Sequence, residues 1–217
     1  MNEIELKRRG LLCVVSGPSG SGKTTLCRRF SKEDPEAVYA ISATTRGPRE
    51  GERDGVDYFF LERSEFEART TRGEFLEFAE VHGNLYGTLK NEVLTHIEAG
   101  RDVLMDIDVQ GAELIRQQDD PRIIEALVDL FILLPSDEEL LTRLGGRGTE
   151  TEEQTQLRLA NAREESRHWQ EYHYALVSRD KETDFETFSA ILAGERCRTT
   201  RLTPLGPGRD EHPELDL

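Results

Sequence analysis

The chain has 217 residues, of which 36% are hydrophobic and 33% charged, and this length and composition suit one α/β domain. Its formal net charge of −15 at pH 7 argues against nucleic acids and membranes as partners. The sequence has no apolar run of membrane-spanning length, no signal-peptide pattern, and no metal-ligand spacing among its three cysteines. We therefore expect a cytoplasmic protein. Its oligomeric state, monomer or homo-oligomer, is not determined by the sequence.

The N-terminal part of the sequence carries its most informative motif. Residues 11–15 (LLCVV) predict a buried strand, and residues 23–31 predict a helix. Between them, GPSGSGKT fits the pattern G-x-x-x-x-G-K-[ST] of a phosphate-binding loop in its required strand–loop–helix context. The glycines allow several backbone N–H groups to converge on an anion, and the helix N-terminus adds its dipole. Lys23 is expected to supply a positive charge to the β- and γ-phosphates, and Thr24 is expected to bind Mg²⁺.

This motif predicts a site for a nucleoside triphosphate. The alternative is a surface glycine loop that fits the pattern by chance, and the flanking strand and helix argue against it. The residues expected to contact the triphosphate are those of the loop and the first helical turn: Gly17, Pro18, Ser19, Gly20, Ser21, Gly22, Lys23, Thr24 and Thr25.

The segment that follows the first helix predicts a small, mainly β lobe. Residues 38–42 and 58–61 predict strands, separated by a long loop (43–57) that contains glycine, proline and three arginines. Ser64 and Glu67 form a capping-box pattern for a short helix to about residue 71. Residues 75–79 and 81–86 predict a hairpin. Residues 42–87 are therefore expected to form a lobe inserted into an α/β core.

The loop of this lobe carries a candidate phosphate site. Arg46 and Arg49 lie three residues apart, and Tyr58 follows in a strand. Two guanidinium forks and a phenol hydroxyl suit a phosphate monoester dianion. The alternative is that these are ordinary solvated loop residues. A cluster of arginines is, however, a stronger indication of an anion site in a chain of net charge −15 than in a basic protein.

The rest of the chain alternates strands with helices. Strands are predicted at 103–108, 128–134 and 174–178, with helices at 88–99, 109–118, about 136–144, about 151–169 and around 185–192. This order implies an α/β fold with a mostly parallel, doubly wound sheet, whose ligand crevice lies beyond the carboxyl ends of the strands. Residues 203–217 are rich in proline, glycine and acidic side chains and predict a disordered tail.

One strand of this core ends in two acidic residues. Asp106 and Asp108 are separated by one residue, so the alternation of a strand places them on one face. Together with Thr24 they are candidates for holding Mg²⁺, because that ion prefers oxygen ligands. The alternative is a solvated strand end.

Five ordered segments together resemble guanylate kinases: GPSGSGKTT, SATTRGPREGERDGVDYFF, GEFLEFAEVHGNLYGT, DIDVQG and GRGTETEE. The resemblance runs from about Leu11 to Arg201. It implies a P-loop NTPase core (10–41 and 88–202), an inserted lobe (42–87) that binds the nucleoside monophosphate, and a helical lid (143–165). The implied reaction transfers the γ-phosphoryl group of ATP to GMP, and also to dGMP, in purine nucleotide metabolism. ATP and GMP are then the partners, with Mg²⁺ as cofactor.

The resemblance also implies roles for individual residues. Those expected to hold the GMP phosphate are Arg46, Arg49, Tyr58 and Tyr86. Those expected to read guanine are Ser42, Glu77, Thr88 and Asp108. The residues expected to be catalytic are Lys23, Arg46, Arg147 and Arg158. Those expected to contact ATP from the lid are Arg143 and Arg147. The Glu77 carboxylate fits this reading, since guanine presents N1–H and N2–H₂ as adjacent donors and adenine does not.

The sequence departs from the family pattern after its last strand. Val177, Ser178, Arg179 and Asp180 stand where the family usually has Val-Asn-Asp or Val-Asn-Asn, so the preference for ATP as donor stays open. Residues 119–126 are extra sequence and are expected to lengthen a surface loop.

Two other functions are compatible with part of this sequence pattern. One is an inactive, guanylate-kinase-like interaction module, which the intact phosphate loop and Arg147 argue against. The other is a kinase for another phosphorylated small molecule, which the joint presence of Ser42, Glu77 and Thr88 argues against.

Overall fold

The computed structural model describes residues 5–145 and 152–205, and its centre is a five-stranded sheet in the order β10-β9-β2-β8-β3. All neighbouring strands in this sheet run parallel, as the alternation of strands and helices predicted. The strands are β2 (Leu12–Ser16), β3 (Ala37–Tyr39), β8 (Asp102–Asp106), β9 (Leu127–Leu133) and β10 (Tyr174–Val177).

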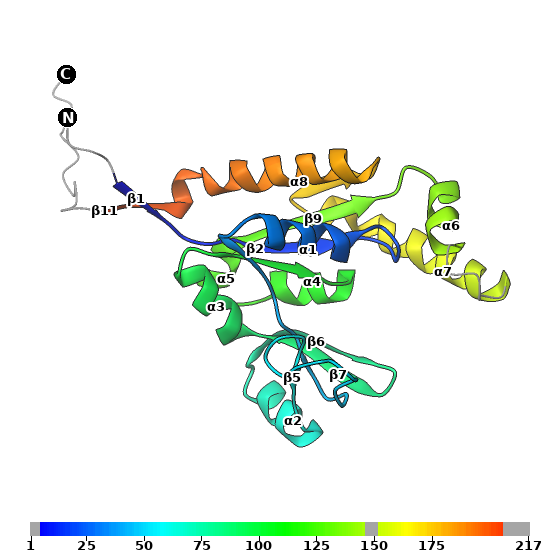
Figure 1. The fold of residues 1–217 in the computed structure, drawn as a ribbon, viewed down its shortest axis with the longest axis horizontal. Helices are drawn as coiled ribbons and strands as arrows, with labels where there is room; N and C mark the ends of the chain where they lie inside the picture. Colours follow the sequence, from blue (N-terminus) through cyan, green and yellow to red (C-terminus); the bar gives the residue numbers. More distant parts are fainter. Residues whose placement is uncertain (1–4, 146–151, 206–217) are drawn as a thin grey trace.

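Helices cover both faces of this sheet (Figure 1). On one face, α1 (Lys23–Glu33) and α8 (Lys181–Arg196) pack against Cys13 and Val15 of β2. On the other face, α3 (Lys90–Glu98), α4 (Val109–Arg116) and α5 (Pro121–Ala126) pack against Leu12 and Val14. Successive side chains of a strand point to opposite faces, which explains why the entire run LLCVV is apolar.

A second sheet lies to one side of the core and has the order β5-β4-β7-β6. It consists of β4 (Ala43–Thr44), β5 (Phe59–Phe60), β6 (Phe75–Val81) and β7 (Asn84–Leu89), and α2 (Arg63–Thr71) packs on it. Its small apolar core is separate from that of the central sheet, and in it the rings of Phe66 and Phe75 stack with centroids 4.2 Å apart.

The N-terminus of α2 corrects one prediction from the sequence. The N-cap of α2 is Glu62, with no side-chain capping hydrogen bond, so Ser64 does not cap this helix. Glu67 instead forms an ion pair with Arg63, at 3.0 Å.

Two helices, α6 (Asp137–Gly145) and α7 (Glu152–Ser166), stand at the carboxyl edge of the sheet, and the short 3-10 helix η1 (Arg167–Glu171) continues α7. Leu140, Leu159 and Ala162 form an apolar cluster of their own. Arg147, predicted as a lid residue, lies in 146–151, outside the described residues.

Two further segments differ from expectation. The extra sequence at 119–126 forms α5 rather than a loop, because Asp120 accepts a hydrogen bond from Arg122 N (2.9 Å), Pro121 opens the helix, and Ile123 and Ala126 are buried. At the chain ends, β1 (Glu5–Arg8) pairs antiparallel with β11 (Leu202–Leu205), which follows the 3-10 helix η2 (Thr199–Arg201). Residues 203–205, expected in a disordered tail, are thus part of a strand, whereas 206–217 lie outside the description.

Within residues 5–145 and 152–205, no helix is both long enough and apolar enough to cross a membrane.

Candidate nucleotide site

The phosphate loop connects β2 to α1 at the carboxyl end of the central strand. Gly17 has φ +146°, and a Cβ there would lie 2.5 Å from the carbonyl oxygen of Ile132, so the turn requires glycine. Gly22 is the N-cap of α1 in the left-handed region, at φ +95°. The N–H groups of the first turn of α1 therefore open directly onto the loop.

Lys23 folds back over this loop. Its Nζ donates to the carbonyl oxygens of Gly17 (2.6 Å) and Pro18 (3.1 Å). Burial lowers the pKa of Lys23, and the nearby carboxylates of Glu165 and Asp106 partly oppose this shift. Glu165 lies on α7. Its proximity to Lys23 cannot be read from the sequence, because many residues of this helix are charged and Lys23 is far away in the chain.

Asp106, at the end of β8, meets Thr24 across the first turn of α1. The Thr24 hydroxyl donates to Asp106 Oδ2 at 2.5 Å, and the Tyr39 hydroxyl donates to the other carboxylate oxygen. Burial and this hydrogen bond raise the pKa of Tyr39. A hydroxyl and a carboxylate on one side of the loop are oxygen ligands of the kind that Mg²⁺ prefers.

This pair does not amount to a complete metal cage. Among the described residues there is no group of three or more histidine, cysteine, aspartate or glutamate side chains that could hold a metal ion. A Mg²⁺ ion here would take its remaining ligands from nucleotide phosphates and water, which is usual for this ion. Asp108, the other predicted metal residue, caps α4 by accepting a hydrogen bond from Gly111 N at 2.8 Å.

Three of the predicted phosphate-binding residues come together in the inserted lobe. The guanidinium carbon of Arg46 lies 5.3 Å from the centre of the Tyr58 ring, and the Tyr58 and Tyr86 rings are 6.2 Å apart. Hydrogen bonds from Arg46 to Glu52, at 3.0 and 2.9 Å, raise the pKa of Arg46. Glu52 was missed in the sequence, although an acidic residue inside an arginine-rich loop is a signal that could have found it. The Arg49 side chain is exposed.

Glu77 and Thr88 face each other across the β6–β7 ladder and are both buried, with Glu77 9% exposed and Thr88 1%. Burial raises the pKa of Glu77, and the negative charge of Asp108 adds to this, while hydrogen bonds from Thr88 act in the opposite direction. Glu77 of the lobe and Asp108 of the core are thus close enough to influence each other electrostatically. Ser42, just before β4, accepts a hydrogen bond from Phe59 N through its carbonyl oxygen, at 2.9 Å.

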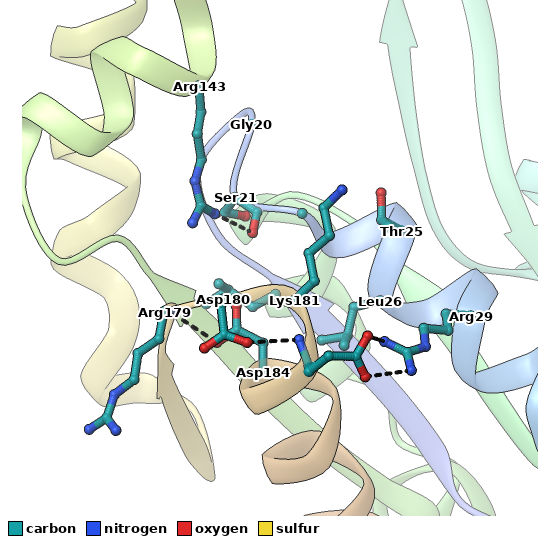
Figure 2. A pocket seen from close by; sticks show the side chains of 13 residues that line it. Gly20, Ser21, Thr25, Leu26, Arg29, Arg143, Arg179, Asp180, Lys181 and Asp184 are labelled. Atoms are coloured by element: carbon teal, nitrogen blue, oxygen red, sulfur yellow. Dashed lines mark hydrogen bonds and ion pairs between the residues drawn. The ribbon is translucent and has the colours of Figure 1, made fainter.

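A cavity of about 620 Å³ lies beside the phosphate loop (Figure 2). It lies between the loop with α1 and the segment that leads into α8, and its residues include Gly20, Ser21, Gly22, Thr25, Leu26, Arg29, Ile132, Arg143, Arg179, Asp180, Lys181, Glu182 and Asp184.

Two of the three predicted lid arginines reach the phosphate loop. Arg143 donates to the Ser21 carbonyl oxygen at 3.5 Å and to Ser178 Oγ at 3.1 Å. Arg158 donates to Ser19 Oγ at 3.0 Å. Both side chains therefore contact the phosphate loop.

Known proteins resemble this chain over most of its length. The family model for guanylate kinase matches residues 9–195. The guanylate kinase of Cereibacter sphaeroides is 46% identical over 196 residues, covering 90% of this chain and 92% of the relative. That of Clostridioides difficile is 42% identical over 194 residues, covering 89% and 92%. The crystal structure of guanylate kinase from Anaplasma phagocytophilum superposes with a TM-score of 0.69 at 33% identity, covering 91% of this chain and 92% of that one. The chain therefore belongs to the guanylate kinase family.

Proposed function

We propose that this chain transfers the γ-phosphoryl group of ATP to GMP, and also to dGMP, and so produces ADP and GDP or dGDP for purine nucleotide metabolism. The observation that carries the proposal is the presence of two separate clusters with basic side chains in one molecule, which we assign to the two substrates. The phosphate loop with Lys23 and Thr24 forms the donor end, and the cluster of Arg46, Tyr58 and Tyr86 forms the acceptor end. A kinase for a phosphorylated acceptor needs both ends.

The buried pair of Glu77 and Thr88 supports guanine as the acceptor base. A carboxylate can accept hydrogen bonds from guanine N1–H and N2–H₂ together. Adenine has no such donor pair, so binding AMP would leave a buried acceptor without a partner. Glu77 is buried within a β-ladder, and a rigid strand positions such an acceptor better than a loop would. Ser42 and Asp108 are proposed to complete the recognition of the base.

The catalytic work proposed for this site is positioning and charge neutralisation, without an essential general base. Phosphoryl transfer requires the two nucleotides to be held in line and positive charge on the transferring group. We assign that charge to Lys23, Arg46, Arg158 and Arg147, with Arg143 and Arg49 on the flanking phosphates. Thr24 with Asp106, and with Asp108 nearby, would hold Mg²⁺, which when bound neutralises charge on the phosphate oxygens.

The inactive interaction module is not supported. Guanylate kinases 42–46% identical to the chain cover about nine-tenths of it, and the loop keeps its glycine backbone geometry and its lysine. Three cysteines without a disulfide suit the reducing cytoplasm, which we propose as the location, with no nucleic-acid or membrane partner.

Product formation tests the proposed reaction. Purified protein with ATP and Mg²⁺ is expected to phosphorylate GMP and dGMP, and to leave AMP, UMP and CMP nearly unchanged. Lys23→Met is expected to lower kcat on the order of 10²- to 10³-fold, whereas Lys32→Met, at an exposed position of the same helix, is expected to keep full activity. Absence of GDP, while a control nucleotide kinase is active in the same buffer, would overturn the proposal.

A further inference from the structure

Strand β6 is irregular immediately before Glu77, the residue proposed to read the acceptor base. In the pairing of β6 with β7, Phe75 lies opposite Leu89 and Glu77 lies opposite Thr88. Between these two pairs β6 advances by two residues, whereas β7 advances by one. Leu76 is therefore an extra residue in β6, and the strand has a β-bulge at this point.

The bulge changes which face of the lobe sheet the side chains of β6 occupy. In a regular strand, Phe75 and Glu77 would point to the same face, because side chains alternate with a period of two residues. In the structure, Phe75 packs in the apolar core of the lobe, on the face of Leu85 and Leu89. Glu77 shares the opposite face with its partner Thr88. Without the extra residue, the Glu77 carboxylate would be directed into the apolar core of the lobe.

The face that carries Glu77 also carries one of the tyrosines assigned to the GMP phosphate. Tyr86 lies two residues before Thr88 in β7, so their side chains point to the same face. The ring of Tyr86 is 6.2 Å from that of Tyr58 in the proposed phosphate cluster. The bulge thus brings Glu77 to the side of the lobe sheet on which Tyr86 lies.

The extra residue is held by the core of the protein. Gln118 follows α4, which contacts β6 where the lobe adjoins the core (Figure 1). Its Nε2 donates to the carbonyl oxygen of Leu76 at 2.7 Å and to that of Leu114, in α4, at 3.3 Å. The Leu76 side chain is 1% exposed and packs in the apolar core of the central sheet. The core therefore holds Leu76 by both its side chain and its carbonyl oxygen, whereas Phe75 belongs to the lobe.

A bulge disrupts the ladder locally, so a carbonyl group at a buried bulge needs a partner from elsewhere. The side-chain amide of Gln118 is such a partner. We infer, on the basis of the proposed function, that Gln118 is a positioning residue for guanine recognition. Its hydrogen bond to Leu76 fixes the bulge, and the bulge directs the Glu77 carboxylate to the acceptor site. Gln118 acts through Leu76 and Glu77 and does not itself contact the base.

Gln118→Met tests this hydrogen bond, because methionine has a similar length and no N–H donor. The loss of the bond is expected to lower kcat/KM for GMP about 3- to 10-fold. The GMP:AMP ratio of kcat/KM should fall by the same factor, since the phosphate cluster holds either nucleotide. The value of kcat at saturating GMP and the KM for ATP should change little. Gln117→Met is the matched control and should leave all these constants unaltered, since the Gln117 side chain donates to Glu113 of α4.

A GMP:AMP ratio in Gln118→Met equal to that of the parent protein would overturn the inference. An equal loss of kcat/KM for ATP would also overturn it, because a general loss of folded structure affects both substrates. Should Gln118→Met fail to fold, as judged by urea unfolding, Gln118→Glu provides the same test, since an ionised carboxylate keeps the size of the amide and cannot donate.

A binding measurement separates this inference from the proposed function. If the parent protein forms no GDP from ATP and GMP, the proposed reaction fails, and the role of Gln118 is then read from calorimetric titration with GMP. Gln118→Met should give a Kd for GMP about 3- to 10-fold higher than those of the parent protein and Gln117→Met. Equal Kd values in the three proteins would overturn the inference independently of turnover.

Discussion

The Glu52 carboxylate holds the Arg46 guanidinium through two hydrogen bonds, from Nη1 at 3.0 Å and from Nη2 at 2.9 Å. The same carboxylate accepts a third hydrogen bond from the backbone N of Arg49, at 2.7 Å. One side chain therefore closes the loop that carries both arginines and keeps Arg46 near the ring of Tyr58. The proposed acceptor end is thus held together by contacts within the protein.

Glu52→Gln should loosen this arrangement. Because the side chains of Arg46 and Glu52 are partly open to water, the change is expected to raise KM for GMP about 2- to 5-fold, with a smaller effect on kcat. Steady-state kinetics with GMP varied at saturating donor measures both constants. Glu50→Gln, an exposed acidic residue of the same loop, is the matched control, and equal effects of the two changes would contradict the assigned role.

Glu77→Gln should reduce the discrimination between GMP and AMP. The amide would turn a donor toward the donors of guanine, at a cost of about 1.5–3 kcal/mol in a buried position. This corresponds to a loss on the order of 10- to 100-fold in kcat/KM for GMP, with little change for AMP. Glu80→Gln, on the exposed part of β6, should leave the GMP:AMP ratio unaltered. Retention of selectivity in Glu77→Gln would rule out Glu77 as the reader of the base.

His173 should make stability depend on pH in a defined direction. Its hydrogen bond to the buried carboxylate of Asp129, an ion pair at 2.7 Å, raises the pKa of His173 above 6.5, although burial opposes the shift. A raised folded-state pKa stabilises the protein fully below the unfolded value of 6.5. That contribution is lost as pH rises through the higher folded-state pKa.

Urea unfolding across this range should therefore show a free energy of unfolding that declines as pH rises above 6.5. His173→Gln should flatten that part of the curve. His82→Asn, at an exposed turn residue, should keep the dependence of the parent protein. A curve for His173→Gln that parallels the parent would exclude this pair as its source.

Phe66→Ala should destabilise the inserted lobe more than the central sheet. Phe66 is fully buried and stacks on Phe75 in an apolar cluster that contains no residue of the central sheet. Removing such a ring costs about 3–5 kcal/mol, and part of that loss should appear as local opening. Hydrogen exchange should therefore accelerate in β6 and β7 more than in β2 and β9. Phe78→Ala, at a 43% exposed position of β6, is the control and should have a much smaller effect.

Two copies of one sequence pattern show how far local reasoning reaches. Ser136 and Ser64 are each followed three residues later by glutamate. Ser136 caps α6 by accepting a hydrogen bond from Glu139 N at 3.2 Å, whereas α2 begins before Ser64. The pattern is identical in both places, but the position at which the helix begins differs. Strand β5 ends only two residues before the Glu62 N-cap, so α2 has already begun when the chain reaches Ser64.

The sequence by itself determined the features that depend on neighbouring residues. The apolar run before the glycines predicts a buried strand, the loop pattern predicts an anion site at a helix N-terminus, and alternating strands and helices predict the parallel sheet. These are local rules of backbone geometry and burial. The structure shows the buried strand, the helix that begins after the glycines and the parallel sheet, whereas the anion site stays a prediction. The family resemblance, which rests on five ordered motifs, is likewise a property of the sequence alone.

Only the tertiary structure decided which charged side chains meet. Glu165 could be placed near Lys23, and Arg29 on Glu182, only once the helices had packed, because the long separation of these residues in the chain carries no signal. The hydrogen bond from Gln118 to the Leu76 carbonyl oxygen is equally distant in the sequence. Side-chain partners of this kind depend on three-dimensional packing, which no local sequence pattern encodes.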